Sequence, residues 1–106
     1  MNIPEISVQE LEALRKANAD IFILDVRNPD EYATCNLEGY LIPFNELSSR
    51  LNELNKEQHI IVHCHSGGRS RRATEFLIQQ GFKNVCNLRG GVTAWANEID
   101  PTMRKY

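Results

Sequence analysis

Apolar positions along the chain follow two patterns, one of strand length and one of helical spacing. The continuous apolar runs at 21–26 ("IFILDV") and 59–64 ("HIIVHC") are typical of strands that are covered on both faces. A shorter run at 84–88 ("NVCNL") predicts a third strand. Elsewhere, apolar residues recur every three or four positions and predict helices at about 8–17, 44–54, 70–81 and 91–99.

Polar residues at two helix starts support these boundaries. Ser7 and Glu10 form a capping-box pattern ahead of the first helix. Asn28 and Pro29 are placed to cap and begin a further short helix over 28–32. Strands that alternate with helices in this way predict an α/β fold, in which a parallel or mostly parallel sheet carries helices on both faces.

The composition limits the class of protein. A chain of 106 residues is long enough for one modest core, so we assign residues 1–106 to a single domain. The formal charge of −2 gives no reason to expect nucleic acid or a membrane surface as a partner. No apolar run reaches the roughly 18 residues of a membrane-spanning helix, and the N-terminus lacks a signal-peptide pattern. We therefore expect a cytoplasmic protein, in which thiols stay free.

Polar residues follow two of the predicted strands at their carboxyl ends. Cys64 ends one strand, and Asp25 and Arg27 lie at the end of another. In open α/β sheets ligands bind at this edge, so these side chains are expected to gather there. We interpret Asp25 and Arg27 as a hydrogen-bonded pair that supports the site rather than as substrate-binding residues.

The loop that follows Cys64 has the features of an anion-binding nest. Gly67 and Gly68 allow backbone conformations that are closed to other residues, so the amides of 65–70 can turn toward the sulfur. A helix that begins near Ser70 adds its positive N-terminal end. This arrangement is expected to stabilise a thiolate, which is the nucleophilic form of cysteine.

Three arginines lie in or just after this loop. Arg69 is the best candidate for recognising an anionic donor, with the positive field of Arg71 and Arg72 in support. His65 lies inside the loop and is expected to be exposed and to tune the local charge, not to act as a general base. The cysteines outside the loop, at 35 and 86, are interpreted as small buried apolar residues, because three widely spaced cysteines fit neither a disulfide framework nor a zinc site.

The length of the loop separates two chemistries. Four residues, "HSGG", stand between Cys64 and Arg69, whereas cysteine phosphatases place five residues there to enclose a phosphate. The shorter loop favours a persulfide, which adds a single atom to the cysteine. Two alternatives stay open: a phosphatase or arsenate reductase that uses the same cysteine, and a non-catalytic interaction module that keeps the fold.

Three stretches resemble the motifs of a known family: "LDVRNPDEY", "CHSGGRS" and "LRGGVTAWANE". Together they span residues 24–98 and resemble a single rhodanese domain, a sulfurtransferase. Two further stretches, "CNLEGYLIPFNEL" and "IDPTMRKY", are similar to the rhodanese domain at the C-terminus of ubiquitin-activating-like adenylyltransferases of thiamine and molybdopterin synthesis.

The resemblance implies a sheet of about five strands and a sulfur-transfer activity. It places the nucleophile at Cys64 and implies no metal ion and no organic cofactor. The donor would be a small molecule such as thiosulfate, and the acceptor a thiophile or a sulfur-carrier protein. The sulfur-binding loop would comprise His65, Ser66, Gly67, Gly68, Arg69 and Ser70.

Overall fold

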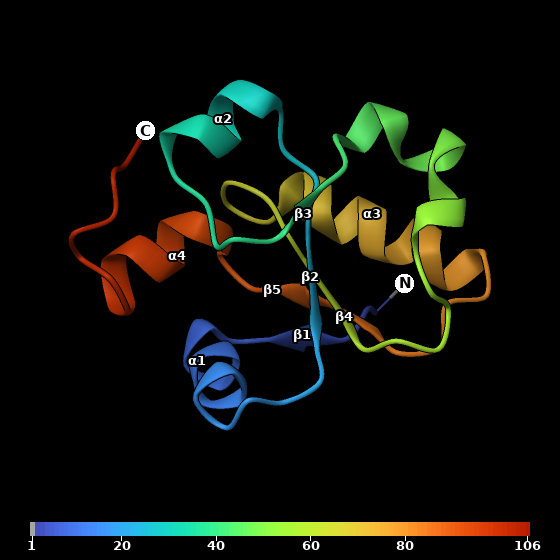
Figure 1. Ribbon diagram of the computed structural model, residues 1–106, viewed down its shortest axis with the longest axis horizontal. Coiled ribbons are helices and arrows are strands. Elements are labelled where there is room, and N and C mark those ends of the chain that lie inside the picture. Colours follow the sequence, from blue (N-terminus) through green and yellow to red (C-terminus); the bar gives the residue numbers. More distant parts are fainter. Residues whose placement is uncertain (1) are drawn as a thin grey trace.

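A five-stranded parallel sheet forms the centre of the computed structural model, which describes residues 2–106 (Figure 1). Its order is β1-β5-β4-β2-β3, so β4 is the central strand. Every pairing is parallel, which confirms and sharpens the predicted mostly parallel sheet. The strands are β1 (Glu5–Ile6), β2 (Phe22–Asp25), β3 (Tyr40–Leu41), β4 (Ile60–His63) and β5 (Val85–Leu88).

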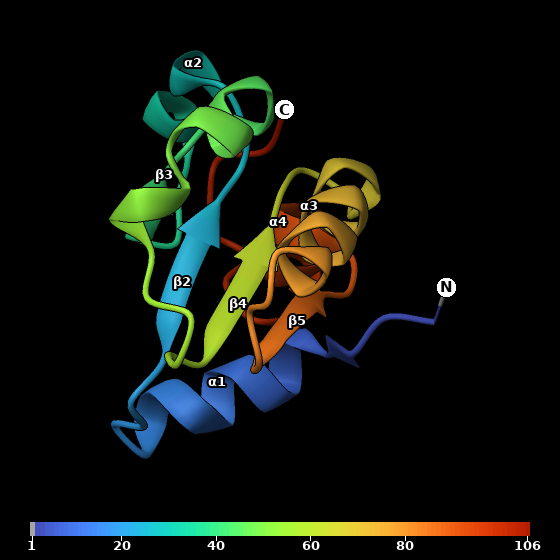
Figure 2. The same cartoon turned by 90° about the vertical axis from the view of Figure 1, so that its right-hand side faces the viewer.

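Helices cover both faces of the sheet, as the sequence pattern predicts (Figures 1 and 2). One face packs against α1 and α4, and the other against α3 and the 3₁₀ helices η1 and η2. A short helix, α2, follows β2 at the edge where β4 also ends. The bounds are α1 (Val8–Lys16), α2 (Pro29–Thr34), η1 (Phe44–Ser49), η2 (Leu51–Glu53), α3 (Gly68–Gln79) and α4 (Gly91–Glu98).

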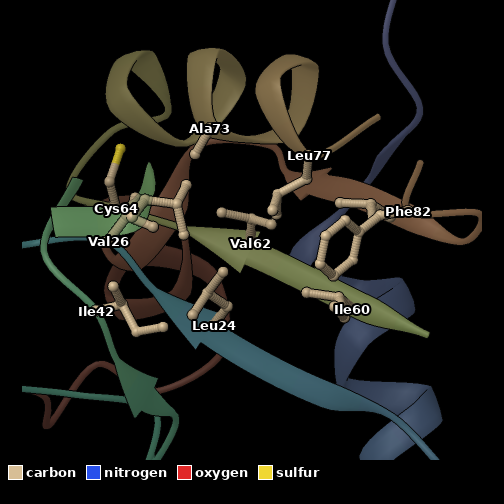
Figure 3. Close-up of a cluster of buried hydrophobic side chains, with 11 residues drawn as sticks. Leu24, Val26, Ile42, Ile60, Val62, Cys64, Ala73, Leu77 and Phe82 are labelled. Atoms are coloured by element: carbon tan, nitrogen blue, oxygen red, sulfur yellow. The ribbon is translucent and has the colours of Figure 1, made fainter. Parts of the chain in front are cut away.

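The alternation of side chains along β4 decides which residues face α3. Ile60, Val62 and Cys64 belong to the apolar cluster beneath α3, whereas Ile61 belongs to the cluster beneath α1 and α4. Figure 3 shows the Cys64 side chain beside this first cluster, with its sulfur directed toward the first turn of α3. His63 consequently lies on the opposite face from Cys64.

Three elements differ from their predicted form. The helix predicted from 70 begins two residues earlier, at Gly68, because Gly67 with φ +121° turns the chain directly into it. The strands β1 and β3 have two residues each, so they are too short for an apolar pattern in the sequence to predict them. The capping box at Ser7 and Glu10 is confirmed, with hydrogen bonds of 3.0 and 3.1 Å.

The helix predicted at 44–54 is wrong in type. The segment forms η1 and η2 instead, and Arg50 with φ −122° interrupts them. The Ser49 hydroxyl donates to the carbonyl of Glu46 at 2.9 Å, and local bonds of this kind compete with a continuous α-helix. Leu47 is nevertheless buried in the core, so the apolar face was assigned correctly although the helix was not.

A buried polar group lies beneath the carboxyl edge of the sheet. The Arg27 guanidinium binds the Asp25 carboxylate at 2.7 Å, and both side chains are fully buried. His63 is also fully buried, and its ring nitrogens have no hydrogen-bond partner. Because burial disfavours the charged ring, the pKa of His63 falls from 6.5 to about 4, although the Asp25 carboxylate 3.7 Å away opposes this.

His63 should make the fold sensitive to mild acid. In the unfolded chain His63 takes up a proton near pH 6.5, but in the folded protein only near pH 4. The unfolded state therefore binds more protons between these values, and stability is lost as the pH falls through this window. Between pH 7 and pH 5 the free energy of unfolding should drop by about 2 kcal/mol from this residue. Urea denaturation at both pH values measures this difference.

The His63→Gln variant should lose most of this pH dependence, whatever its stability at pH 7. His59→Gln, at the half-buried histidine just before β4, should keep this pH dependence. Equal pH dependence in the wild type and in His63→Gln would contradict the assignment.

Candidate active site

The backbone of Cys64 and His65 is fixed by the start of α4. Val92 N–H donates to the Cys64 carbonyl at 3.1 Å, and Thr93 N–H donates to the His65 carbonyl at 3.0 Å. Gly91 permits this approach, because a Cβ at that position would lie 2.3 Å from the Cys64 carbonyl oxygen. Its φ of +56° also favours glycine. The "GG" of the third motif therefore holds the cysteine loop in place.

The Cys64 sulfur faces two backbone amides. Gly67 N–H donates to Sγ at 3.2 Å, and Ser70 N–H does so at 3.4 Å. The Ser70 hydroxyl oxygen also lies 3.4 Å from Sγ. Both amides belong to the turn that begins α3, so the positive end of that helix points at the sulfur. This is the nest predicted from the two glycines, with two of the amides of 65–70 in contact.

An open hollow of about 380 Å³ lies over the sulfur. It is lined by four of the six predicted loop residues, by Cys64 and by Arg72. Gly67 and Ser70 are buried beneath it. The loop residues on the lining are His65, Ser66, Gly68 and Arg69.

The three arginines have different surroundings. Arg69 forms a bidentate ion pair with Glu31 of α2, with N–O distances of 2.7 and 2.8 Å. Arg72 lines the hollow and places its guanidinium over the Phe44 ring, 5.2 Å from the ring centre. Arg71 points elsewhere on the helix and pairs with Glu5 at 2.9 Å.

The expected contribution of Arg71 to the field at the sulfur needs correction. Its charge is paired with the Glu5 carboxylate of β1, because successive residues on a helix point in different directions.

Glu31 is a site residue that sequence reasoning did not single out. Its carboxylate accepts hydrogen bonds from Arg69, from Asn28 N–H at 2.9 Å and from the Tyr106 hydroxyl at 3.0 Å. These donors, Arg69 above all, lower the pKa of Glu31 to about 2. Glu31 stands in the "NPDEY" stretch quoted above, so the motif contained the signal although no role was assigned to it.

The Asp25–Arg27 pair forms as predicted, but on the opposite face of the sheet from the sulfur. Arg27 donates to the Cys35 carbonyl at 2.7 Å and to the Glu31 carbonyl at 3.3 Å, and it also binds the Tyr106 hydroxyl at 2.9 Å. The pair therefore fixes α2 and the chain after it. It reaches the cysteine loop through the ion pair that α2 makes with the loop, and through Tyr106, which contacts both Arg27 and His65.

His65 is half-buried, not exposed as expected. Its ring stacks on Tyr106 with centres 4.3 Å apart, and Nε2 lies 3.0 Å from the Tyr106 carbonyl oxygen. Tyr106 was also missed by the sequence reasoning, because nothing local marks it as close to the loop.

The two other cysteines are set apart from the nest. Cys86 is buried, and this burial raises the pKa of its thiol to about 11, in agreement with a small apolar role. Cys35 is only half-buried, at the end of α2. Among residues 2–106, no group of three or more His, Cys, Asp or Glu side chains could hold a metal ion. Over the same residues, every helix is too short or too polar to cross a membrane.

Comparison with known proteins gives consistent matches. The rhodanese-like domain model matches residues 7–98. A sulfurtransferase of Allochromatium vinosum is 35% identical over 95 residues, which cover 89% of each chain. The thiosulfate sulfurtransferase GlpE of Pseudoalteromonas translucida is 35% identical over 97 residues, which cover 90% of each chain. The crystal structure of a rhodanese-like domain protein from Staphylococcus aureus superposes with a TM-score of 0.83 at 30% identity, over 92% of this chain and 95% of the other.

The expected likeness to adenylyltransferases is also found, at greater distance. The probable adenylyltransferase/sulfurtransferase MoeZ of Mycobacterium tuberculosis is 30% identical over 104 residues, which cover 95% of this chain but 26% of MoeZ. The three motifs, the sheet order and these matches agree with one another, and the chain belongs to the rhodanese-like family of sulfurtransferases.

Proposed function

We propose that this protein moves sulfane sulfur from a small anionic donor such as thiosulfate to a thiophilic acceptor, through a persulfide on Cys64. The observation that carries the proposal is the pair of amides, from Gly67 and Ser70, that meet at the sulfur beneath an open hollow. Amides in this position stabilise negative charge on sulfur without a general base. The similarity to a protein named thiosulfate sulfurtransferase supports thiosulfate as the donor.

The reaction proceeds in two displacements. The Cys64 thiolate attacks the outer sulfur of thiosulfate, so that a cysteine S–S bond forms, the S–S bond of the donor breaks, and sulfite leaves with the electron pair. Cyanide in the test tube, or a thiol or sulfur-carrier protein in the cell, then attacks the terminal sulfur. This step releases thiocyanate or a new persulfide and restores the thiolate, and no metal or organic cofactor takes part.

The hollow has room for a persulfide, and the amides beneath it suit the negative charge of that group. One added sulfur extends from Sγ into the hollow, within reach of the amides that already face Sγ. The donor would be recognised at the mouth by Arg69 and Arg72. Arg69 keeps N–H groups that Glu31 does not use, since a guanidinium has five donors. Chemistry that depends on a free thiol fits a reducing cytoplasm.

The nucleophile can be tested by substitution. Cys64→Ser should reduce thiosulfate:cyanide sulfur transfer to background, because serine has a similar shape but does not accept sulfur. Intact mass after thiosulfate treatment should show one added sulfur on the wild type, removable by a reductant, and none on the variant. Cys35→Ser and Cys86→Ser are the matched controls and should stay active. Thiocyanate production by a folded Cys64→Ser variant would refute the assignment.

The role of Arg69 can be separated from that of its partner. Arg69→Ala should raise KM for thiosulfate by roughly tenfold and lower kcat less, since a binding interaction with the donor anion is lost. Glu31→Gln keeps Arg69 but removes the neutralising charge, so KM for thiosulfate should fall. Steady-state kinetics at low ionic strength measure both effects. An unchanged KM in Arg69→Ala would show that this arginine only fixes α2.

The size of the loop distinguishes sulfur transfer from phosphate chemistry. The wild type should hydrolyse p-nitrophenyl phosphate negligibly, because the amides lie too close to Sγ for a phosphoryl group. One glycine inserted after Gly68 should widen the loop, weaken sulfur transfer and improve binding of phosphate or arsenate. A Cβ at Gly68 would meet no other atom within 4 Å, so there is open space beside the loop at the point of insertion. Faster phosphate hydrolysis than sulfur transfer by the wild type would favour the phosphatase alternative.

A further inference from the structure

A chain of hydrogen bonds leads from the Cys64 sulfur along the α3 face of the sheet to its edge strand, β1. The Ser70 hydroxyl oxygen lies 3.4 Å from Sγ and donates to Asn87 Oδ1 of β5 at 2.5 Å. Asn87 Nδ2 in turn donates to Glu5 Oε2 of β1 at 2.8 Å. Ser70 and Asn87 are 0% and 1% exposed, so water does not compete for these bonds. The chain therefore links the proposed nucleophile to β5 and β1, away from the hollow.

Glu5 fixes the direction of this chain. Its carboxylate can only accept hydrogen bonds, and its pKa is lowered by the Asn87 amide and by Arg71 at 2.9 Å, so it stays ionised. The Asn87 side chain must then turn its N–H₂ group toward Glu5. Its carbonyl oxygen consequently faces Ser70.

The Ser70 hydroxyl has a single proton to donate. Two acceptors lie within reach, Asn87 Oδ1 at 2.5 Å and the Gly67 carbonyl at 3.2 Å, and the closer one takes the proton. The hydroxyl therefore presents its lone pairs to Sγ and accepts from the S–H of the thiol. A thiolate at Cys64 keeps the two backbone amides but receives no hydrogen bond from this hydroxyl.

The charged and titratable groups near the sulfur lie outside the chain of hydrogen bonds that runs from Ser70 to Glu5. Arg69, Arg72 and His65 line the hollow, and His63 lies across the sheet. Arg69 is neutralised by Glu31. Among residues 2–106, the Asn87 side chain hydrogen-bonds to Ser70 and Glu5 and to none of these groups, so substitution of Asn87 removes none of their hydrogen bonds.

We propose that Asn87, oriented by Glu5, is a positioning residue that keeps the Ser70 hydroxyl from donating to the Cys64 sulfur and so holds the resting cysteine toward the thiol form. This deepens the proposed function, and rests on it only in taking Cys64 as the nucleophile. When the Ser70 hydroxyl is released from Asn87, it can rotate and donate to the thiolate. Hydrogen bonds to charged groups are the stronger ones, so this release would raise the reactivity of the cysteine.

The test is the pH profile of Cys64 alkylation by iodoacetamide, followed by mass spectrometry of the peptide that carries Cys64. Asn87→Leu removes the acceptor at similar volume. The pH of half-maximal alkylation should fall by about one unit, which gives about tenfold faster alkylation below the midpoint. Asn84→Leu, at an exposed residue just before β5, is the matched control and should leave the profile unchanged.

A Ser70→Ala background shows whether the effect passes through the hydroxyl. In this background Asn87→Leu should produce no further shift, because the group that it releases is gone. The same shift with and without the hydroxyl would overturn the proposal, as would an unshifted profile in a folded Asn87→Leu protein.

Glu5→Gln provides a second variant at a more accessible position, should Asn87→Leu fail to fold. It removes the charge that orients Asn87, so the pH of half-maximal alkylation should also fall, by a smaller amount than in Asn87→Leu. An unchanged pH of half-maximal alkylation would contradict the proposal. Alkylation needs no sulfur donor. Loss of the proposed sulfurtransferase activity would therefore be seen separately from the shift.

Discussion

The site depends on one close approach between two backbone segments that lie far apart in the sequence. The first amides of α4, from Val92 and Thr93, hold the carbonyls of Cys64 and His65, and this contact is possible only because Gly91 has no side chain. The peptide planes after β4 are thereby fixed, and with them the path of the loop into α3. The amide that Gly67 directs at the sulfur is a consequence of that path. A motif near the end of the chain thus determines the geometry around a cysteine near its middle.

The positive charge available at the site is smaller than a sequence rich in arginine suggests. Of the three arginines after the cysteine, one is matched by Glu31, one by Glu5, and one lies over an aromatic ring. The proposed sulfur chemistry then relies chiefly on neutral backbone dipoles to stabilise negative charge on the sulfur. Such dipoles are fixed in direction and keep their strength when the pH or the salt concentration changes, unlike a mobile surface charge.

Local patterns predicted the parts of this structure that local forces decide. The long strands, the capped helices and the glycine loop that directs amides at Cys64 could be predicted, because apolar runs and glycine spacing are visible within a few residues. Glu31, Asn87 and Tyr106 could not be placed, since they reach the loop from α2, β5 and the last residues of the chain. The error at 44–54 has a different cause: leucine spacing identified the buried face, but the Ser49 hydroxyl bonds to the Glu46 carbonyl and competes with a continuous α-helix.

The two outermost strands, β1 and β3, have only two residues each. An edge strand exposes unpaired backbone groups, which can act as a template for another chain, and short edges limit the length of any such pairing. The interior strands β2 and β4 lie in long apolar runs with high β-propensity, which would favour aggregation if they stood at an edge. By placing these runs inside and ending the sheet on strands of two residues, the fold protects itself against edge-to-edge association at the high concentrations found in cells.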